Sequence, residues 1–347
     1  MPCAMSAILP SAMRAVVLQE PGRLRAAVLP CPSCPAGGVV VRVQACGVCR
    51  SDLKMAAEGH RALVYPRVPG HEAAGTVAAS RSPAFKIGDR VTVAPGLRCG
   101  RCPHCRRGAD QRCESRDIIG FSLDGGFAEY LAVPLQGEPR GALVPLPECL
   151  EFAGAALAEP LACCLNAQSR VSLGAGDRVL VVGAGILGLL HLVLARRSGA
   201  ASIWVVEPRA GRRDLALALG ADLAFDPSAL RDLPRSSRDV LIMAAGPVAL
   251  AGPLAAGLAR GGRICLFSGP GPGSAGLPDA AAIHYQELLV SGSYGCAQGH
   301  IRRAVGLLAE GRVPIDRLVT GRIRLADLPA YLTAGPGPAD LKTVVEI

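Results

Sequence analysis

The residues best suited to chemistry in this chain are cysteines, histidines and acidic residues, and they occur in two patterns. The first is compact: Cys99, Cys102, Cys105 and Cys113 follow one another as C-x2-C-x2-C-x7-C in a polar segment. Four thiolates on short spacers can surround Zn²⁺ without leaving a position for water, which is typical of a structural site. The common bacterial iron–sulfur run has a shorter last spacer and a following proline. We therefore predict structural zinc, with His104 as a solvated loop residue.

The second pattern is dispersed along the chain. Cys49 and Asp52 lie in CGVCRSDLK, His71 and Glu72 in PGHEAAG, and Glu159 in AEPLACC. One thiolate, one imidazole and one carboxylate leave a fourth position open for water or substrate, as a catalytic zinc requires. Each residue alone has an ordinary explanation, since a lone cysteine is usually a small buried hydrophobe and Glu159 could simply begin a helix. Their joint occurrence indicates a catalytic metal.

A glycine motif in the second half of the chain predicts a dinucleotide site. The apolar run 179–182 is typical of a strand buried in a parallel sheet, and G-x-G-x-x-G begins directly after it. These glycines allow a tight turn, a close approach of backbone to a pyrophosphate, and close helix packing. The next strand, 202–206, ends where a carboxylate would bind ribose hydroxyls. The predicted cofactor-binding residues are Gly183, Gly185, Ile186, Leu187, Gly188 and Glu207.

The residue at the end of that strand also predicts which cofactor is preferred. The carboxylate of Glu207 suits free ribose hydroxyls and repels the 2'-phosphate of NADP, so NAD is expected. Arg209, Arg212 and Arg213 lie just beyond it and would seat a phosphate if Glu207 turned away, so NADP stays open. Their ordinary explanation is the solvated basic face of a helix.

Composition narrows the class of protein. A chain of 347 residues favours two domains, and no apolar run approaches the ~18 residues that a membrane span needs, so no membrane partner is expected. The net charge of +9 comes almost entirely from arginine, but the arginines are scattered and aromatic residues are few, which disfavours nucleic-acid binding. Fourteen cysteines without an export signal indicate reduced thiols and metal ligands in a cytoplasmic protein.

Two kinds of patterning follow one another along the chain. The first part has short apolar strands broken by glycine and proline, which predicts a largely antiparallel β domain. From about residue 159 helix formers appear and strands alternate with helices, which predicts a doubly wound parallel sheet. The expected strands are 15–18, 38–43, 75–79, 90–93, 127–133, 179–182, 202–206, 221–225, 239–243, 262–267, 284–293, 322–325 and 342–347, and the expected helices include 209–219, 247–260 and 298–311.

The ordered set of motifs resembles the zinc-dependent medium-chain alcohol dehydrogenase family, in its polyol, sorbitol and threonine dehydrogenase-like branch. C-x-x-C-x-S-D at 46–52 is followed by G-H-E-x-x-G at 70–75, G-D-R-V at 88–91, the four-cysteine loop, E-P-L at 159–161 and the glycine motif. The resemblance implies an α/β fold in two domains. These are a GroES-like β-rich catalytic domain over 13–160 and 298–347, with its structural zinc loop at 95–113, and a Rossmann doubly wound parallel sheet domain over 161–297, after an N-terminal extension of residues 1–12.

The resemblance also implies roles for the dispersed residues. Cys49, rather than Cys46, would be a zinc ligand because it stands three positions before the aspartate of its motif. His71 would be the second ligand and Glu159 the third. Glu72 would be either a fourth ligand in the resting state or a neighbour that exchanges with water.

Further positions match residues that serve the ligands, the proton or the cofactor. Asp52 would orient His71 by hydrogen bonding. Ser51 matches the hydroxyl that starts proton release from the alcohol, and Arg50 and Lys342 match positions that contact cofactor phosphate.

One position departs from the family pattern. Liver-type members have a histidine five residues after the cysteine to pass the proton to solvent, whereas this chain has Lys54. Either His60, further along the loop, or water completes the relay.

The expected function is therefore the reversible, NAD-linked oxidation of a secondary alcohol to a ketone, with two zinc ions per chain. The Glu159 ligand and the segment 284–289 resemble the polyol branch, so a polyol, sugar or aminocyclitol is the expected substrate. The family is usually dimeric or tetrameric. The alternatives are a zinc-free NADPH quinone reductase or sensor of the same fold, and a zinc-ribbon nucleic-acid-binding protein that uses Arg101, Arg106, Arg107 and Arg112.

Overall fold

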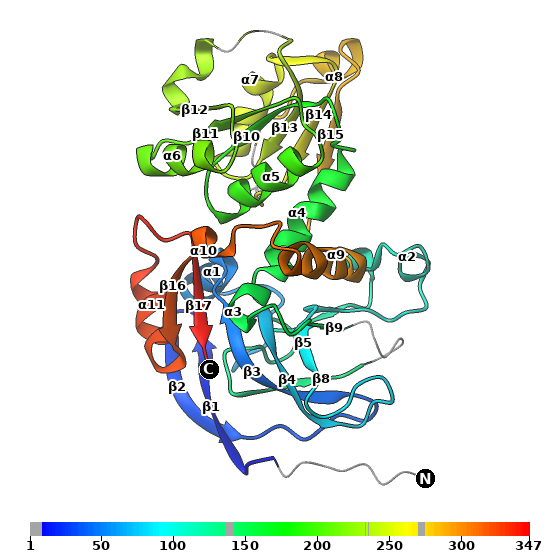
Figure 1. Ribbon diagram of the computed structural model, residues 1–347, viewed down its shortest axis with the longest axis vertical. Coiled ribbons are helices and arrows are strands. Elements are labelled where there is room, and N and C mark those ends of the chain that lie inside the picture. Colours follow the sequence, from blue (N-terminus) through cyan, green and yellow to red (C-terminus); the bar gives the residue numbers. More distant parts are fainter. Residues whose placement is uncertain (1–8, 136–141, 233, 235, 270–274) are drawn as a thin grey trace. The chain divides into compact units, whose positions relative to one another are not determined.

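The computed structural model describes residues 9–135, 142–232, 234, 236–269 and 275–347 (Figure 1). The chain divides into two compact units. The first comprises the described residues up to Ala162 together with Cys296–Ile347, and the second comprises Cys163–Gly295. The predicted boundaries, after residues 160 and 297, lie two residues from these divisions. Of the predicted N-terminal extension, residues 1–8 lie outside the described residues, and Ala12 already belongs to a strand.

The first unit is built on a mixed sheet in which the strands run antiparallel except for the parallel pair of β16 and β17. Its strand order is β16-β17-β3-β4-β5-β9, with β8 also paired to β3, and β1 and β2 form a separate antiparallel pair. This arrangement matches the antiparallel β domain predicted from the short apolar segments. The strands are β1 (Ala12–Glu20), β2 (Arg23–Pro30), β3 (Val39–Gly47), β4 (Glu72–Ser80), β5 (Arg90–Val93), β6 (Gly96–Leu97), β7 (Asp117–Ile118), β8 (Tyr130–Val133), β9 (Leu143–Pro145), β16 (Val319–Arg324) and β17 (Lys342–Glu346).

Strand β3 is central to the core of the first unit. Val39, Val41 and Val43 are buried in one cluster with Phe127, whereas Arg42 between them is exposed. Each such buried side chain contributes roughly 1.5–3 kcal/mol, so the alternation fixes the register of this strand. The helices of this unit are α1 (Arg50–Glu58), α2 (Pro103–Arg106), α3 (Phe152–Ala155), α9 (Gln298–Ala309), α10 (Ile315–Leu318) and α11 (Leu328–Ala334), and α4 (Ala158–Arg170) continues into the second unit.

The second unit holds a parallel sheet with the order β12-β11-β10-β13-β14-β15. The chain starts at the centre with β10, proceeds outward through β11 and β12, and then returns to β13. In open α/β sheets the ligand binds where the strand order reverses, here between β10 and β13. Figure 1 shows α5 and α6 beside β10, β11 and β12. The elements are β10 (Arg178–Val182), α5 (Ile186–Arg197), β11 (Ser202–Val206), α6 (Ala210–Ala218), β12 (Leu223–Phe225), β13 (Arg238–Met243), α7 (Ala251–Ala255), β14 (Leu258–Leu266), α8 (Ala280–Tyr285) and β15 (Leu289–Gly292).

Two predicted elements of the second unit were wrong in extent. The helix expected over 247–260 ends at Ala255, because the chain already pairs with β13 from Leu258 onward. The strand expected over 284–293 begins only at Leu289, because Asp279 starts a helix before it. Its Oδ1 atom accepts a hydrogen bond from the backbone N–H of residue 282 at 2.6 Å, and alanines follow.

Helix length also bears on membranes. In the described part of the chain, no helix is both long enough and apolar enough to cross a bilayer.

Candidate active site

Cys49 and Asp52 are brought together by the first turn of α1. Cys49 is the N-cap residue of this helix, and its backbone N–H donates to Asp52 Oδ2 at 2.8 Å. The other carboxylate oxygen of Asp52 lies 3.4 Å from His71 Nδ1. Both side chains are buried, with exposed fractions of 1% for Asp52 and 7% for His71. A single carboxylate therefore caps the helix and faces the imidazole, and the orienting role of Asp52 stays a prediction.

His71 lies at the entry to β4, directly after Gly70, whose φ of 96° lets the chain turn there. With Nδ1 facing Asp52, the ring presents Nε2, and Ser51 Oγ lies 3.5 Å from that atom. Burial alone would lower the pKa of His71, but Asp52 and the Cys49 thiol outweigh it and hold that pKa well above its ordinary value. The surroundings of His71 therefore favour positive charge and are suited to a cation.

The neighbouring Glu72 is the first residue of β4. Its partner in the register of β3 and β4 is Gly47, and Gly47 also pairs with β17, the strand that begins with Lys342. The Lys342 ammonium forms an ion pair with Glu72 and donates to the backbone carbonyl of Val48 at 3.0 Å. Although burial by itself lowers the pKa of Lys342, Glu72 holds that pKa above its usual value.

Cys49, His71 and Glu72 form the donor set that we call the mixed cluster. One donor atom of each lies within 4.8 Å of the other two. Glu72 Oε1 is buried and has no hydrogen-bond partner among the described residues, which is expected of an atom that faces an ion. Sulfur, imidazole nitrogen and carboxylate oxygen are the ligands of a zinc site with an open position, so these residues fit Zn²⁺.

Glu159, the predicted third ligand, lies outside the donor set of the mixed cluster. It lies in the first turn of α4, and within the described residues it is not one of the three donors around Cys49. It is near enough to influence Glu72. Burial is the largest effect that raises the pKa of Glu72, and the negative charge of Glu159 raises that pKa further. Glu72 therefore stands third in the donor set here, and a ligand role for Glu159 stays a prediction.

The four cysteines of the compact pattern come together in the first unit. The Sγ atoms of Cys99, Cys102, Cys105 and Cys113 all lie within 4.8 Å of one another. Hydrogen bonds from backbone N–H groups lower the pKa of Cys99 to about 6, while burial raises the pKa of Cys105 to about 12. N–H groups that face sulfur favour thiolates, and the four-sulfur set fits a closed tetrahedral Zn²⁺ site.

The glycine motif forms the turn from β10 into α5 in the second unit. Gly183 has a φ of 97°, and a Cβ at Gly188 would collide with the Gly183 carbonyl, so both positions require glycine. A Cβ at Gly185 would have only Arg212 Nη1 near it, at 3.9 Å, an ordinary contact distance. Glu207 accepts hydrogen bonds from the backbone N–H of Ala184 at 2.8 Å and of Arg209 at 3.1 Å. The carboxylate thus lies against the turn that is predicted to hold the pyrophosphate.

The remaining predicted residues differ in what they contact. Arg50 is exposed at the first position of α1. Lys342, also predicted to contact cofactor phosphate, is 2% exposed and is directed at Glu72. Lys54, which replaces the relay histidine, is exposed and lies 3.9 Å from Glu58 on its own helix.

Sequence reasoning missed two features of this site. It did not pair Lys342 with Glu72, although a lysine at the start of the apolar run KTVVE was a signal that its charge needs a partner. It also gave no role to Phe121, whose ring lies 5.5 Å from the His71 ring, centroid to centroid.

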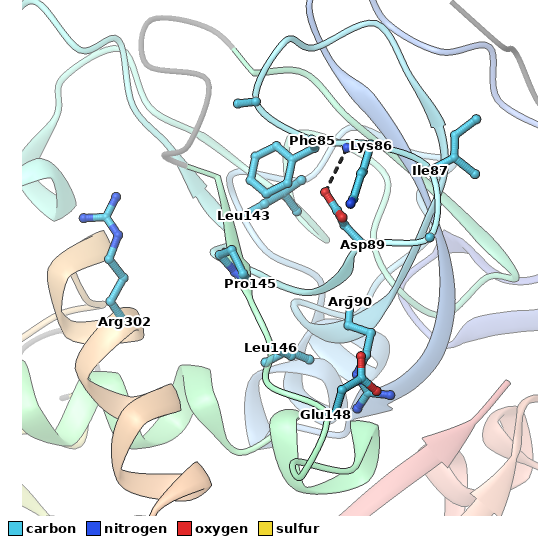
Figure 2. Close-up of a pocket in the computed structure, with 12 residues that line it drawn as sticks. Phe85, Lys86, Ile87, Asp89, Arg90, Leu143, Pro145, Leu146, Glu148 and Arg302 are labelled. Atoms are coloured by element: carbon cyan, nitrogen blue, oxygen red, sulfur yellow. Dashed lines mark hydrogen bonds and ion pairs between the residues drawn. The ribbon is translucent and has the colours of Figure 1, made fainter.

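A cavity elsewhere in the first unit is not part of this site. It has a volume of about 930 Å³ and lies between the segment Ala84–Arg90, the end of β9, and Arg302 of α9 (Figure 2). Asp89 in its wall accepts a hydrogen bond from the backbone N–H of Lys86 at 2.8 Å. None of the mixed cluster lines it.

Comparison with known proteins agrees with this geometry. The description "Alcohol dehydrogenase GroES-like domain" belongs to a family model that matches residues 35–148, and "Zinc-binding dehydrogenase" to one that matches 187–310. D-altritol 5-dehydrogenase of Agrobacterium fabrum is 32% identical over 95% of this chain and 98% of its own length. Sorbitol dehydrogenase of Bacillus subtilis is 29% identical over 92% of this chain and 93% of its own.

Solved structures give the same result. A protein from Sinorhizobium meliloti 1021, described as a zinc-binding dehydrogenase and bound to NADP, superposes with a TM-score of 0.90 at 31% identity, covering 97% of this chain and 100% of that one. The 2R,3R-butanediol dehydrogenase of Bacillus subtilis superposes with a TM-score of 0.86 at 27% identity, covering 96% and 99%. The chain thus has a GroES-like part and a Rossmann-type part and is an oxidoreductase that belongs to the zinc-dependent medium-chain alcohol dehydrogenase family.

Proposed function

We propose that this protein catalyses the reversible, NAD-linked oxidation of a secondary alcohol of a polyol, sugar or aminocyclitol to a ketone. The observation that carries the proposal is the convergence of Cys49, His71 and Glu72, whose donor atoms lie within 4.8 Å of one another. Relatives named for D-altritol and sorbitol support a polyhydroxylated substrate. A zinc-free quinone reductase would not need this donor set.

Two zinc ions per chain are proposed, one in the four-cysteine loop and one held by Cys49 and His71 with Glu72 or Glu159. Zinc bound there supplies a Lewis acid that lowers the pKa of an alcohol hydroxyl and polarises a carbonyl. Asp52 keeps His71 Nε2 directed at the metal position. Ser51, whose Oγ lies 3.5 Å from that nitrogen, would relay the hydroxyl proton by accepting it while passing its own proton on to water, and a bound nicotinamide would accept the hydride.

The glycine turn and Glu207 are proposed to bind NAD. Gly183, Gly185, Ile186, Leu187 and Gly188 would place backbone N–H groups at the pyrophosphate, and Glu207 would accept from the ribose hydroxyls. A similar solved structure is bound to NADP, so NADP is the alternative cofactor, and we propose that the preference for NAD depends on Glu207. Arg50 and Lys342 stay predicted phosphate contacts.

We further propose that the chain forms a homodimer or homotetramer. Strand β15 is the last strand of its sheet, so its outer edge is unpaired within the described residues. Three large apolar side chains in this strand or within four residues of it along the chain are exposed by 47–74%: Tyr285, Leu289 and Tyr294. A free edge with apolar flanks suits pairing with a second copy. Light scattering on Leu289→Lys against wild type tests this, since a monomeric variant is expected.

The enzymatic proposal is tested by counting zinc on purified protein and measuring NAD reduction with sorbitol, altritol and an aminocyclitol. Wild type is expected to hold two zinc ions. Cys49→Ala is expected to retain one zinc and NAD binding but lose turnover, whereas Cys102→Ser is expected to lose the other zinc and thermal stability first. Cys149→Ala is the matched control, because Cys149 is exposed and belongs to neither donor set. Undiminished turnover in Cys49→Ala would refute the proposal.

A further inference from the structure

Three aromatic rings in the first unit form a row that leads away from the mixed cluster. The ring of Phe121 lies 5.5 Å from that of His71 and 5.3 Å from that of His60, between centroids. The contact with His60 is edge-to-face, at 81°. These separations are typical of favourable aromatic pairs, so Phe121 sets the position of His60 relative to the cluster.

Phe121 is itself immobilised. It is 9% exposed and packs in an apolar cluster with Leu18, Met55 and Leu63. Met55 belongs to α1, the helix that also carries Cys49 at its N-terminus. The helix that positions Cys49 thus also packs against Phe121, the residue that contacts His60.

His60 is exposed, yet its ring is held in one orientation. The backbone N–H of Ala62 donates to His60 Nδ1 at 3.1 Å, and the N–H of Leu63 donates to the His60 carbonyl at 3.0 Å. A neutral imidazole that accepts at Nδ1 carries its proton on Nε2. His60 therefore offers one N–H donor, at Nε2, on an exposed ring that contacts Phe121.

We infer that His60 determines specificity by donating a hydrogen bond to a substrate hydroxyl remote from the reacting carbon, an assignment that rests on the proposed function. The imidazoles of His60 and His71 lie within about 11 Å of each other, since each lies 5.3 or 5.5 Å from the Phe121 centroid. A sugar alcohol whose reacting hydroxyl lies at the mixed cluster carries further hydroxyls along its chain, whereas a short monohydric alcohol carries none. A fixed donor discriminates strongly against substrates that lack its partner.

The test compares sorbitol with 2-butanol, a secondary alcohol that has no second hydroxyl. His60→Phe keeps the ring against Phe121 and removes the donor, and His60→Gln restores a donor. We expect His60→Phe to raise the ratio of the KM for sorbitol to the KM for 2-butanol about ten-fold, the effect of one hydrogen bond. His60→Gln is expected to recover most of the loss. Titration calorimetry of sorbitol onto the NADH-loaded enzyme is expected to show the same change in Kd without turnover.

The matched control is Arg61→Phe, which introduces the same side chain at the next exposed position and is expected to leave both substrates unaffected. Equal losses for sorbitol and 2-butanol, or a fall in kcat with both, would overturn the specificity role, the latter indicating proton transfer through His60. Unchanged sorbitol kinetics would also overturn it. The proposed function is judged separately on wild type: if it oxidises neither alcohol, that proposal fails, and the role of His60 fails with it.

Discussion

The carboxylate of Glu72 lies directly over Gly47, so that a Cβ on Gly47 would occupy the space of Glu72 Oε2. The two residues are partners across β3 and β4, and Lys342 approaches from β17 on the other side of β3. A missing side chain on the central strand thus makes room for a buried ion pair beside the mixed cluster. Glu72 is held there by the register of three strands.

Gly47→Ala should therefore displace Glu72. We expect zinc at the mixed cluster and turnover to fall at least ten-fold while the four-cysteine site stays loaded, measured by metal counting and NAD reduction. Gly306→Ala is the matched control. Gly306 lies within α9 with no atom near its would-be Cβ, so alanine there should be neutral or stabilising by roughly 0.5–1 kcal/mol. Full zinc occupancy in Gly47→Ala would show that Glu72 does not help to hold the metal.

Lys342→Met should destabilise the protein strongly. Removing one partner of a buried ion pair leaves the other charge uncompensated and costs about 3–5 kcal/mol. We expect a large drop in Tm for metal-free protein, largely recovered in the double variant Lys342→Met/Glu72→Gln. Lys54→Met is the comparison, because its pair with Glu58 is exposed and worth at most about 0.5 kcal/mol. Similar Tm values for the two single variants would contradict the buried pair.

Asp52→Asn should separate the two tasks of Asp52. An asparagine still caps α1, so helix content by circular dichroism should be unchanged. It no longer offers a charged oxygen to His71 Nδ1, and zinc affinity and kcat/KM are expected to fall about 10- to 100-fold. Asp89→Asn is the matched control. The Asp89 carboxylate accepts a hydrogen bond from the backbone N–H of Lys86 in a loop outside the site, so activity should persist in this variant. If Asp52→Asn retains full zinc affinity, Asp52 does not orient the ligand.

His191 should make stability depend on pH. It is fully buried in α5, and burial lowers its pKa to about 3 from 6.5. Between these values the unfolded chain binds a proton that the folded chain does not, so stability falls with falling pH by up to about 1.4 kcal/mol per unit. The contribution is fully present above pH 6.5. In His191→Leu this component should vanish, as measured by Tm from pH 7 to 4.5. An unchanged pH profile would mean that His191 is not the group responsible.

Glu207→Ser should shift cofactor preference toward NADP. The substitution removes the negative charge that opposes a 2'-phosphate, and we expect the ratio of kcat/KM for NADP to that for NAD to rise at least about ten-fold. Glu310→Ser, at an exposed glutamate in the first unit, should leave the ratio unchanged. If the ratio of kcat/KM for NADP to that for NAD is unchanged in Glu207→Ser, Glu207 does not select the cofactor. Its role would then be structural, through its hydrogen bonds to the backbone N–H groups of Ala184 and Arg209.

Much of this protein was predictable from local patterns. The four cysteines lie within fifteen residues, and the glycine motif is contiguous with its strand and helix, so the backbone alone brings these residues together. Apolar segments likewise predicted most strands, because burial acts on short runs. The predicted limits of the helix 247–260 and of the strand 284–293 were wrong, because strand pairing at Leu258 and the helix N-cap at Asp279 outweighed the apolar pattern.

Three relationships depended on the tertiary structure. Glu72 lies beside Cys49 and His71 in the donor set, and Lys342 lies 294 positions from Val48, whose carbonyl it contacts. The third is the row from His71 through Phe121 to His60. Each follows from how β17, β3, β4 and the loops around α1 align. Sequence spacing does not encode that alignment, because register is settled by packing between segments that lie far apart in the chain.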